Sequence, residues 1–262
     1  MSVAESEIPE SLAAAGVSSE EWDLRERLAA AYHIVDFLGW SESIYGHITL
    51  KLPGGAGHFL INPYGLRYDE VTAENLVKID LAGNRVGPGE YPVNVAGYVI
   101  HSAIHEARDD LACVIHTHTT AGMAVAAQSQ GLLPISIHAS GFFGRVGYHD
   151  YEGPSLAVDE KQRLVESLGD HKVLILRNHG LLVGGATLEE AFILMFRLQR
   201  ACEVQVAAVA GGAELTIPGE ETCRQAADLV DRFLAGNEGV PVGKLEFDAW
   251  ARLVESRRCG AG

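Results

Sequence analysis

Three histidines stand where the sequence could hold a metal ion. His116 and His118 are one residue apart in CVIHTHTTAG, residues 113–122, at the end of an apolar run. Positions i and i+2 of a β-strand share a face, so both imidazoles can point at one position, as a divalent metal requires. Two such histidines alone are more often structural. A third, His179, follows the apolar run VLIL in RNHG, residues 177–180. Three histidines at strand ends can form a three-ligand site with an open position, which is typical of catalytic metals.

The elements that must position these histidines follow from sequence periodicity. Ser18 and Glu21 form a capping box that predicts a first helix, which ends at Gly39. The short runs YGHITLKL, GHFLINP and NLVKIDLAG are separated by turn residues and predict a β-meander. The segment VNVAGYVIHSAIHEAR has helical character, with Gly97, His101 and His105 four residues apart on one face.

The second half of the chain mixes strands and helices. DDLACVIHTH predicts a buried strand and TTAGMAVAAQ a helix. We expect a helix over SLAVDEKQRLVESLGD, then a strand in HKVLILRNHGLLVGG that ends in a loop. Thr187 and Glu190 cap a long helix that Gly211 and Gly212 stop. The elements do not alternate regularly enough for a doubly wound parallel sheet. A layered sheet covered by helices, α+β in character, fits better.

Composition limits the classes of function. The chain has 262 residues, of which 47% are hydrophobic, enough for one large core. Its 35 acidic and 20 basic residues give a formal charge of −15, which argues against nucleic acid and membrane surfaces as partners. The N-terminus lacks a basic, apolar signal and no long apolar run occurs, so a cytoplasmic protein is expected. The four cysteines are far apart, so we expect no disulfides and only Cys259 exposed.

Several motifs occur together in the order found in one known family. INPYGLRYDEVTAENLVKIDLAGNRV, IHTHTTAG and VLILRNHGLLVGGATLEEAF make the chain resemble the class II aldolase/adducin family over about residues 22–212. GHIT, INPYG and NVAGYVIHSAIHEAR resemble a branch distinct from the sugar-phosphate aldolases. The resemblance implies a three-layer α/β/α domain with a central, mainly antiparallel sheet. It also implies a homotetramer with sites between subunits, and one divalent ion (Zn, Mn or Fe(II)) on His116, His118 and His179. We expect an N-terminal extension over 1–21, the domain over 22–235, and a tail with a short helix over 236–262.

The chain departs from the aldolase pattern near the expected metal. The sugar-phosphate aldolases carry a metal-binding, acid/base glutamate four residues before the position of His101, where this chain has Gly97. We therefore expect the space beside Gly97 to be open to water or a substrate carboxylate. His47 stands where those aldolases have a phosphate-binding asparagine, which argues against a phosphorylated sugar as substrate.

Other candidate residues follow from the same resemblance, each with a structural alternative. Asn62 and Gly65 of INPYG join Gly97 as candidate substrate-binding residues, although Asn62 could simply cap the turn. His47 is a candidate catalytic residue or a loop histidine bonded to backbone. The aldolase tyrosine given by a neighbouring subunit falls near ASGFFG, where Tyr148 and Tyr151 are both nearby; Tyr148 is the candidate catalytic residue. His101 and His105 are expected to be packing residues.

The predicted function is a metal-dependent carbon–carbon lyase. A divalent ion on three neutral histidines keeps its full charge and can stabilise the enolate left by aldol cleavage or decarboxylation. Without the glutamate, decarboxylation becomes more attractive, because loss of CO₂ needs no base. The expected substrate is a small non-phosphorylated hydroxy- or keto-carboxylate. The alternatives are a non-heme iron oxygenase of hydroxy acids and a non-catalytic adducin-like interaction module. The apolar helix over 189–210 and the stretch GFFG are expected to contribute exposed apolar surface to an oligomer interface.

Overall fold

One mixed sheet of seven strands forms the centre of the described part of the protein. The computed structural model describes residues 7–54, 56–153, 160–235 and 239–260. Within these ranges the strand order is β3-β2-β1-β4-β7-β6-β5. Only β5 and β6 pair in parallel, and the other neighbours are antiparallel, so the expected mainly antiparallel sheet is confirmed. The strands are β1 (His47–Lys51), β2 (Phe59–Ile61), β3 (Val77–Ile79), β4 (Cys113–Thr117), β5 (Val146–His149), β6 (Val173–Leu176) and β7 (Gly180–Gly185).

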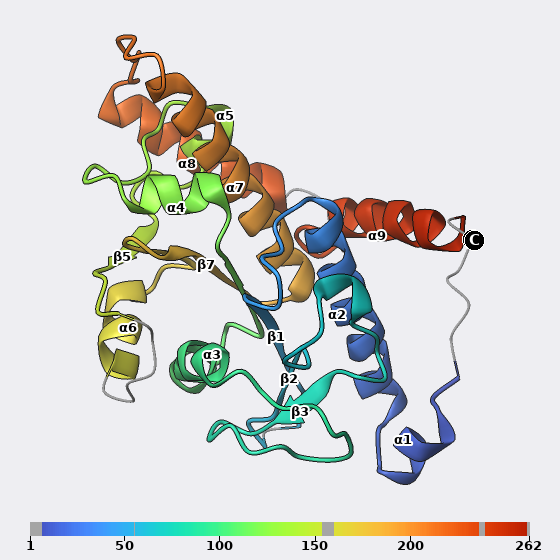
Figure 1. The fold of residues 1–262 in the computed structure, drawn as a ribbon. Helices are drawn as coiled ribbons and strands as arrows, with labels where there is room; N and C mark the ends of the chain where they lie inside the picture. The colour runs from blue at the N-terminus through green and yellow to red at the C-terminus, as the bar shows by residue number, and fades with distance from the viewer. Residues whose placement is uncertain (1–6, 55, 154–159, 236–238, 261–262) are drawn as a thin grey trace.

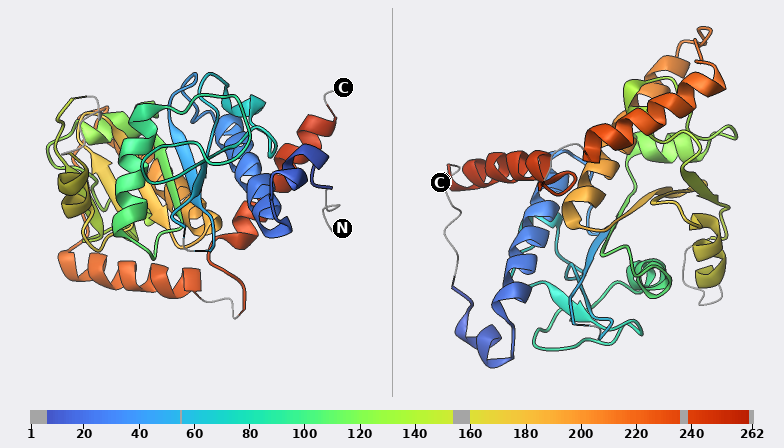
Figure 2. Two further views of the ribbon diagram at one scale, coloured as in Figure 1. Left: turned by 90° about the horizontal axis from the view of Figure 1, so that it is seen from below. Right: turned by 180° about the vertical axis from the view of Figure 1, so that it is seen from behind.

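Helices cover both faces of the sheet, which confirms the three-layer α/β/α architecture (Figures 1 and 2). In β4, Val114 packs in the core that α3 and α6 form, while Ile115 packs against α2, α4, α7 and α9. This alternation makes the central strands apolar on both faces. The helices are α1 (Glu10–Ala14), α2 (Ser19–Phe37), α3 (Val95–Ala107), α4 (Thr120–Ala126), α5 (Ile137–Ser140), α6 (Glu160–Leu168), α7 (Leu188–Val209), α8 (Glu220–Ala235) and α9 (Lys244–Cys259), with a 3₁₀ turn η1 (Tyr68–Glu70).

The predicted helix starts are confirmed by their caps. Ser18 Oγ accepts the Glu21 N–H at 3.1 Å at the start of α2, and Thr187 Oγ1 accepts the Glu190 N–H at 3.2 Å at the start of α7. Each bond satisfies an amide that the helix leaves unpaired. The predicted meander is also confirmed, because β1, β2 and β3 are antiparallel neighbours. Of the helix expected over 155–170, residues 155–159 lie outside the described residues.

One element was missed between residues 171 and 185. The sequence predicts a single strand that ends in a loop, whereas the structure has two antiparallel strands, β6 and β7. The chain reverses at Asn178, whose φ of 55° lies in the left-handed region that Asn tolerates better than most residues. His179 therefore sits in a tight turn between two core strands.

The first and last described helices, α1 and α9, pack on the α2 side of the molecule. Leu12 and Val17 form a small apolar cluster with Trp22 of α2. The tail contains a helix of sixteen residues, α9, and its Phe247 and Val254 lie in the main core. The boundaries at residues 21 and 235 stay predictions. No helix in the described ranges has the length and apolarity needed to cross a membrane.

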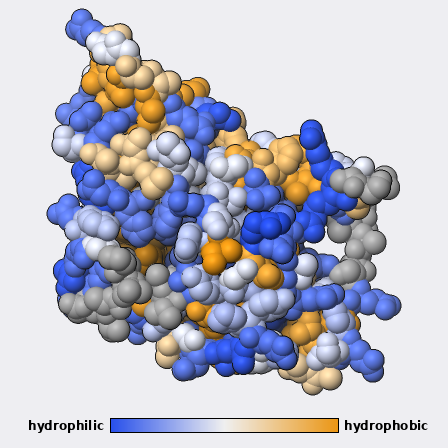
Figure 3. All heavy atoms as spheres, viewed as in Figure 1, coloured by the Kyte–Doolittle hydropathy of each residue, from blue (hydrophilic) through white to orange (hydrophobic). Residues whose placement is uncertain are grey.

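The exposed apolar surface is not where the sequence placed it. Most of the apolar side of α7 faces the core, and Phe142 of GFFG is buried. Exposed apolar side chains occur instead on α5 and α8, where Ile137, Leu229 and Phe233 are 77%, 59% and 73% exposed. Apolar surface is visible near α5 and α7 at the top of Figure 3. All four cysteines are free, and Cys259 is the exposed one, as expected.

Candidate metal centre

Three imidazoles from two neighbouring strand ends converge on one point. His116 lies in β4, His118 follows that strand, and His179 lies in the turn between β6 and β7. β4 pairs with β7, so this turn lies beside the end of β4. The Nε2 atom of His118 is 2.8 Å from Nε2 of His116 and 3.0 Å from Nε2 of His179. The sequence-predicted ligands therefore lie together, with one donor atom of each within 4.8 Å of the others.

Hydrogen bonds on the opposite ring nitrogens fix the orientation of two of these imidazoles. His116 Nδ1 lies 2.9 Å from the carbonyl oxygen of Leu181, and His118 Nδ1 lies 3.0 Å from a carboxylate oxygen of Glu42. Both oxygens only accept, so each Nδ1 carries the proton and each neutral ring presents a lone pair at Nε2. When both rings are neutral, the Nε2 lone pairs of His116 and His118 face each other at 2.8 Å with no proton between them. This donor set therefore fits a cation.

Burial keeps the buried imidazoles in the form that binds metal. It lowers the pKa of His116 well below its usual value, with further lowering from His118 and His179. Burial, together with nearby His118 and His149, lowers the pKa of His179 to about 4. Because only the neutral ring can donate a lone pair, these two residues are ready to bind a metal at neutral pH.

Gly180 allows β7 to approach the ligands closely. A Cβ atom at this position would lie 2.5 Å from the carbonyl oxygen of Thr117 and 3.1 Å from Cδ2 of His118. Real Cβ atoms are not found this close to backbone oxygen. The glycine of RNHG is therefore a steric requirement of the site, which the sequence analysis did not identify.

The space beside Gly97 is filled, so the expectation that it is open was wrong. His47 pairs with His116 across β1 and β4, and their rings stack with centroids 6.1 Å apart. A Cβ on Gly97 would lie 2.1 Å from Cδ2 and 2.4 Å from Nε2 of His47. The side-chain amide nitrogen of Asn94, Nδ2, lies 3.0 Å from His47 Nε2. Burial, with His118 and His179 nearby, lowers the pKa of His47 to about 3, so an uncharged imidazole stands beside the ligands.

The fold agrees with comparisons to known proteins. A family model described as the class II aldolase and adducin N-terminal domain matches residues 26–206. The chain belongs to this family. It is 46% identical over 247 residues to a protein of Pseudomonas aeruginosa named as an aldolase class 2 protein, with 94% of each chain covered. It is 44% identical to rat α-adducin, which the alignment covers over 33% of its length and over 89% of this chain.

Solved structures of the family have the same fold. An aldolase II superfamily protein from Pseudomonas syringae superposes with a TM-score of 0.86 at 46% identity, covering 92% of this chain and 96% of that one. An L-fuculose 1-phosphate aldolase from Glaciozyma antarctica gives a TM-score of 0.79 at 28% identity, with 92% of each chain covered. Class II aldolases usually bind a divalent metal, and in this member three histidines can hold one.

In this class II aldolase/adducin-family protein, the two histidines of α3, His101 and His105, are packing residues, as expected. Thr49 Oγ1 lies 2.7 Å from His101 Nδ1 and 2.8 Å from His105 Nε2. His105 Nδ1 faces the carbonyl oxygen of Leu111 at 3.4 Å, so it carries the proton. Thr49 must then donate to His105 and accept from His101. The three side chains form a fully buried column that attaches α3 to β1.

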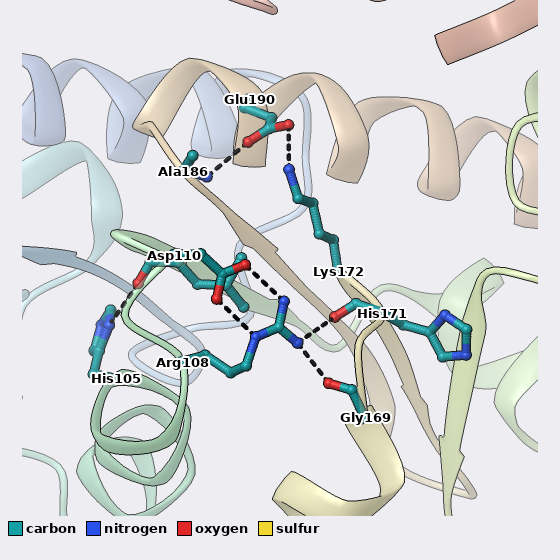
Figure 4. Close-up of polar contacts among 9 residues, drawn as sticks. His105, Arg108, Asp110, Gly169, His171, Lys172, Ala186 and Glu190 are labelled. Carbon is teal, nitrogen blue, oxygen red and sulfur yellow. Dashed lines mark hydrogen bonds and ion pairs between the residues drawn. The ribbon is translucent and has the colours of Figure 1, made fainter. Parts of the chain in front are cut away.

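The far end of α3 is also attached to its neighbours (Figure 4). Arg108 forms an ion pair with Asp110 at 2.8 Å and donates to the carbonyl oxygens of Gly169 and His171, in the turn before β6. Gly97 on α3 is therefore held against His47 by contacts along the length of the helix.

The structure gives the remaining candidates structural partners. Asn62 is buried, and both its main-chain N–H and its side-chain oxygen bond the Tyr32 hydroxyl, at 3.1 and 3.0 Å. Gly65 has a φ of 106°, which favours glycine. The Tyr148 hydroxyl accepts the N–H of Leu132 at 3.0 Å, and the Arg177 guanidinium lies 4.3 Å from its ring centroid. No contact described for these three residues joins them to the three-histidine cluster, so their roles toward substrate stay predictions.

Two further residues near the cluster were missed. Glu42 orients His118 from a loop before β1, and no motif in the sequence marks it. Asn94, which contacts His47, precedes α3 directly, and its carbonyl accepts the Tyr98 N–H at 3.1 Å. An Asn before a helical pattern could have been recognised as a helix start, although not as a neighbour of His47.

Proposed function

We propose that this protein is a metal-dependent carbon–carbon lyase of the aldolase or decarboxylase type. Its substrate would be a small, non-phosphorylated hydroxy- or keto-carboxylate. The observation that carries the proposal is the convergence of the Nε2 atoms of His116, His118 and His179. The Nδ1 atoms of His116 and His118 are hydrogen-bonded to the Leu181 carbonyl oxygen and the Glu42 carboxylate. The name of the Pseudomonas aeruginosa relative, an aldolase class 2 protein, also supports it.

The chemistry follows from the charge of the site. A divalent cation held by the three histidines would act as a Lewis acid that stabilises an enolate. The described ligand set contains no carboxylate, so the site keeps the positive charge that attracts a substrate carboxylate. Glu42 and the Leu181 carbonyl hold the ring orientations. His47, uncharged and 4% exposed, forms a wall of the site and is the candidate catalytic group.

The oligomer is part of the proposal. We infer a homotetramer, in keeping with the family, in which a neighbouring subunit completes the substrate site. The exposed Ile137, Leu229 and Phe233 support an interface on α5 and α8, because large apolar side chains favour burial against a partner.

Two other functions remain as alternatives. Zinc or manganese would serve a lyase, whereas Fe(II) on the same histidines would favour an oxygenase of hydroxy acids. The 44% identity to α-adducin favours an interaction module as the third candidate. A module without chemistry has no need for three convergent nitrogen donors, so we rank it below the enzymes.

Metal analysis tests the proposal most directly. The protein, purified without chelator, should contain one zinc or manganese ion per chain and consume no oxygen with a panel of hydroxy acids. His118→Ala should lose the metal, whereas His58→Ala, a histidine outside the cluster, should keep it. NMR of mixtures with 2-oxo and 2-hydroxy acids should reveal carbon–carbon cleavage that depends on the metal. Iron with oxygen uptake would favour the oxygenase, and stoichiometric metal in His118→Ala would refute the site.

A further inference from the structure

His47 and a side chain at position 97 compete for the same space. Gly97 lies on α3, and a Cβ built on it would approach Cδ2, Nε2 and Cγ of His47 to 2.1, 2.4 and 2.7 Å. Distances below 3.0 Å are essentially never found for a real Cβ. Even alanine at position 97 therefore requires His47 to move.

His47 has little freedom to move. The residue is 4% exposed, and its ring lies between two other imidazoles, stacked on His116 with centroids 6.1 Å apart and edge-on to His101 with centroids 5.4 Å apart. Asn94 contacts its Nε2 atom. The helix cannot withdraw either, because the Thr49 hydroxyl contacts both His101 and His105. Relief of a clash at position 97 must therefore disturb the packing beside the metal-binding histidines.

We infer that positions 47 and 97 form one steric unit that determines which ligands the metal centre accepts. Glycine at 97 admits the imidazole of His47, and this imidazole excludes any side chain at 97 from the space next to His116. The two departures from the aldolase pattern, His47 and Gly97, are thus linked, because the imidazole at position 47 fills the space that a side chain at position 97 would need. A carboxylate can enter from α3 only if position 47 is made small.

The consequence is a preference for anionic ligands. His47 is not an anionic ligand, so its imidazole leaves the charge of the ion available to a small anion, such as a carboxylate with an adjacent hydroxyl or keto oxygen. A side-chain carboxylate in the same space would occupy a coordination position and repel that anion. This consequence rests on the proposed metal site, whereas the steric exclusion does not.

A double-mutant cycle tests the exclusion without metal. Urea unfolding of the apoprotein would compare Gly97→Ala, His47→Ala and the variant that carries both. Gly97→Ala should be destabilised, and much of that loss should disappear when His47→Ala is also present. Gly211→Ala serves as the control, since its Cβ would meet nothing within 4 Å. If Gly97→Ala is as destabilising in the His47→Ala background as it is with His47 retained, the steric unit is refuted.

A second cycle tests ligand choice in the full-length protein. His47→Ala with Gly97→Glu should bind Zn²⁺ about tenfold more tightly or better than His47→Ala alone, and the zinc-loaded double variant should bind oxalate about tenfold more weakly. His47→Ala with Gly97→Gln is the matched uncharged control and should show neither change. Gly97→Glu with His47 retained should not tighten zinc, and tighter binding there would overturn the inference. If the parent protein binds no zinc, the proposed function fails, while the unfolding cycle still decides the steric exclusion.

Discussion

Gly180→Ala should weaken metal binding without altering any ligand. The new methyl group would lie 2.5 Å from the Thr117 carbonyl oxygen, 3.1 Å from His118 Cδ2 and 3.4 Å from His116 Cε1. The nearest atom belongs to the backbone, so no side-chain rotation can relieve the contact. β4 and β7 must separate at the end where the histidines converge.

The expected magnitudes follow from this clash. Overpacking of this kind costs about 1–3 kcal/mol of the free energy of unfolding. Displaced ligand orientation typically weakens metal affinity by about 10–100-fold, or roughly 1.4–2.8 kcal/mol. Urea unfolding of the apoprotein measures the first effect. Zinc competition with a chromophoric chelator measures the second, and the stabilisation by excess zinc should shrink by the same free energy.

Gly184→Ala is the matched control on the same strand. Its Cβ would lie 2.6 Å from Cδ1 of Leu111, away from the ligands and against the end of a flexible side chain. This variant should lose stability while zinc affinity stays within about twofold of the parent, a difference below roughly 0.5 kcal/mol. The reasoning is refuted if both variants lose zinc affinity equally, or if Gly180→Ala binds zinc as the parent does.

Three further predictions concern the buried column, pH and assembly. Thr49→Val should lower the free energy of unfolding by about 2–5 kcal/mol, since two buried nitrogens lose their partner, and Thr49→Ser should recover most of it in urea titrations. Burial lowers the pKa of His105 to about 3, against about 6.5 in the unfolded chain. Below about pH 6.5 the unfolded chain therefore takes up a proton on His105 that the folded protein does not, and the free energy of unfolding decreases as the pH is lowered. Apoprotein unfolding at about pH 7.5 and 5.5 should show a loss of about 1.4 kcal/mol from this residue that is absent in His105→Gln. Light scattering at micromolar concentration should give a tetramer that Phe233→Asp dissociates, and a monomeric parent protein would contradict the proposed assembly.

Local sequence determined most of the elements and the metal-binding candidates. The capping residues of α2 and α7 act within four residues of the chain, so their effect can be read directly. His116 and His118 share a face because side chains alternate along a strand. The apolar runs of β4 and β6 predict buried strands for a similar reason, since each residue type reports its own burial.

Only the tertiary structure decided what surrounds the metal-binding histidines. Glu42, Leu181 and Gly180 reach the site through the pairing of β4 with β7 and through a loop before β1, contacts that sequence spacing does not encode. From the sequence, Gly97 is expected to leave open space where the sugar-phosphate aldolases have a carboxylate. In the structure the ring of His47, fifty residues earlier, fills that space, and it fits only because Gly97 has no side chain. A sequence specifies which side chains are available, but the volume that each one fills depends on which segments the fold brings into contact.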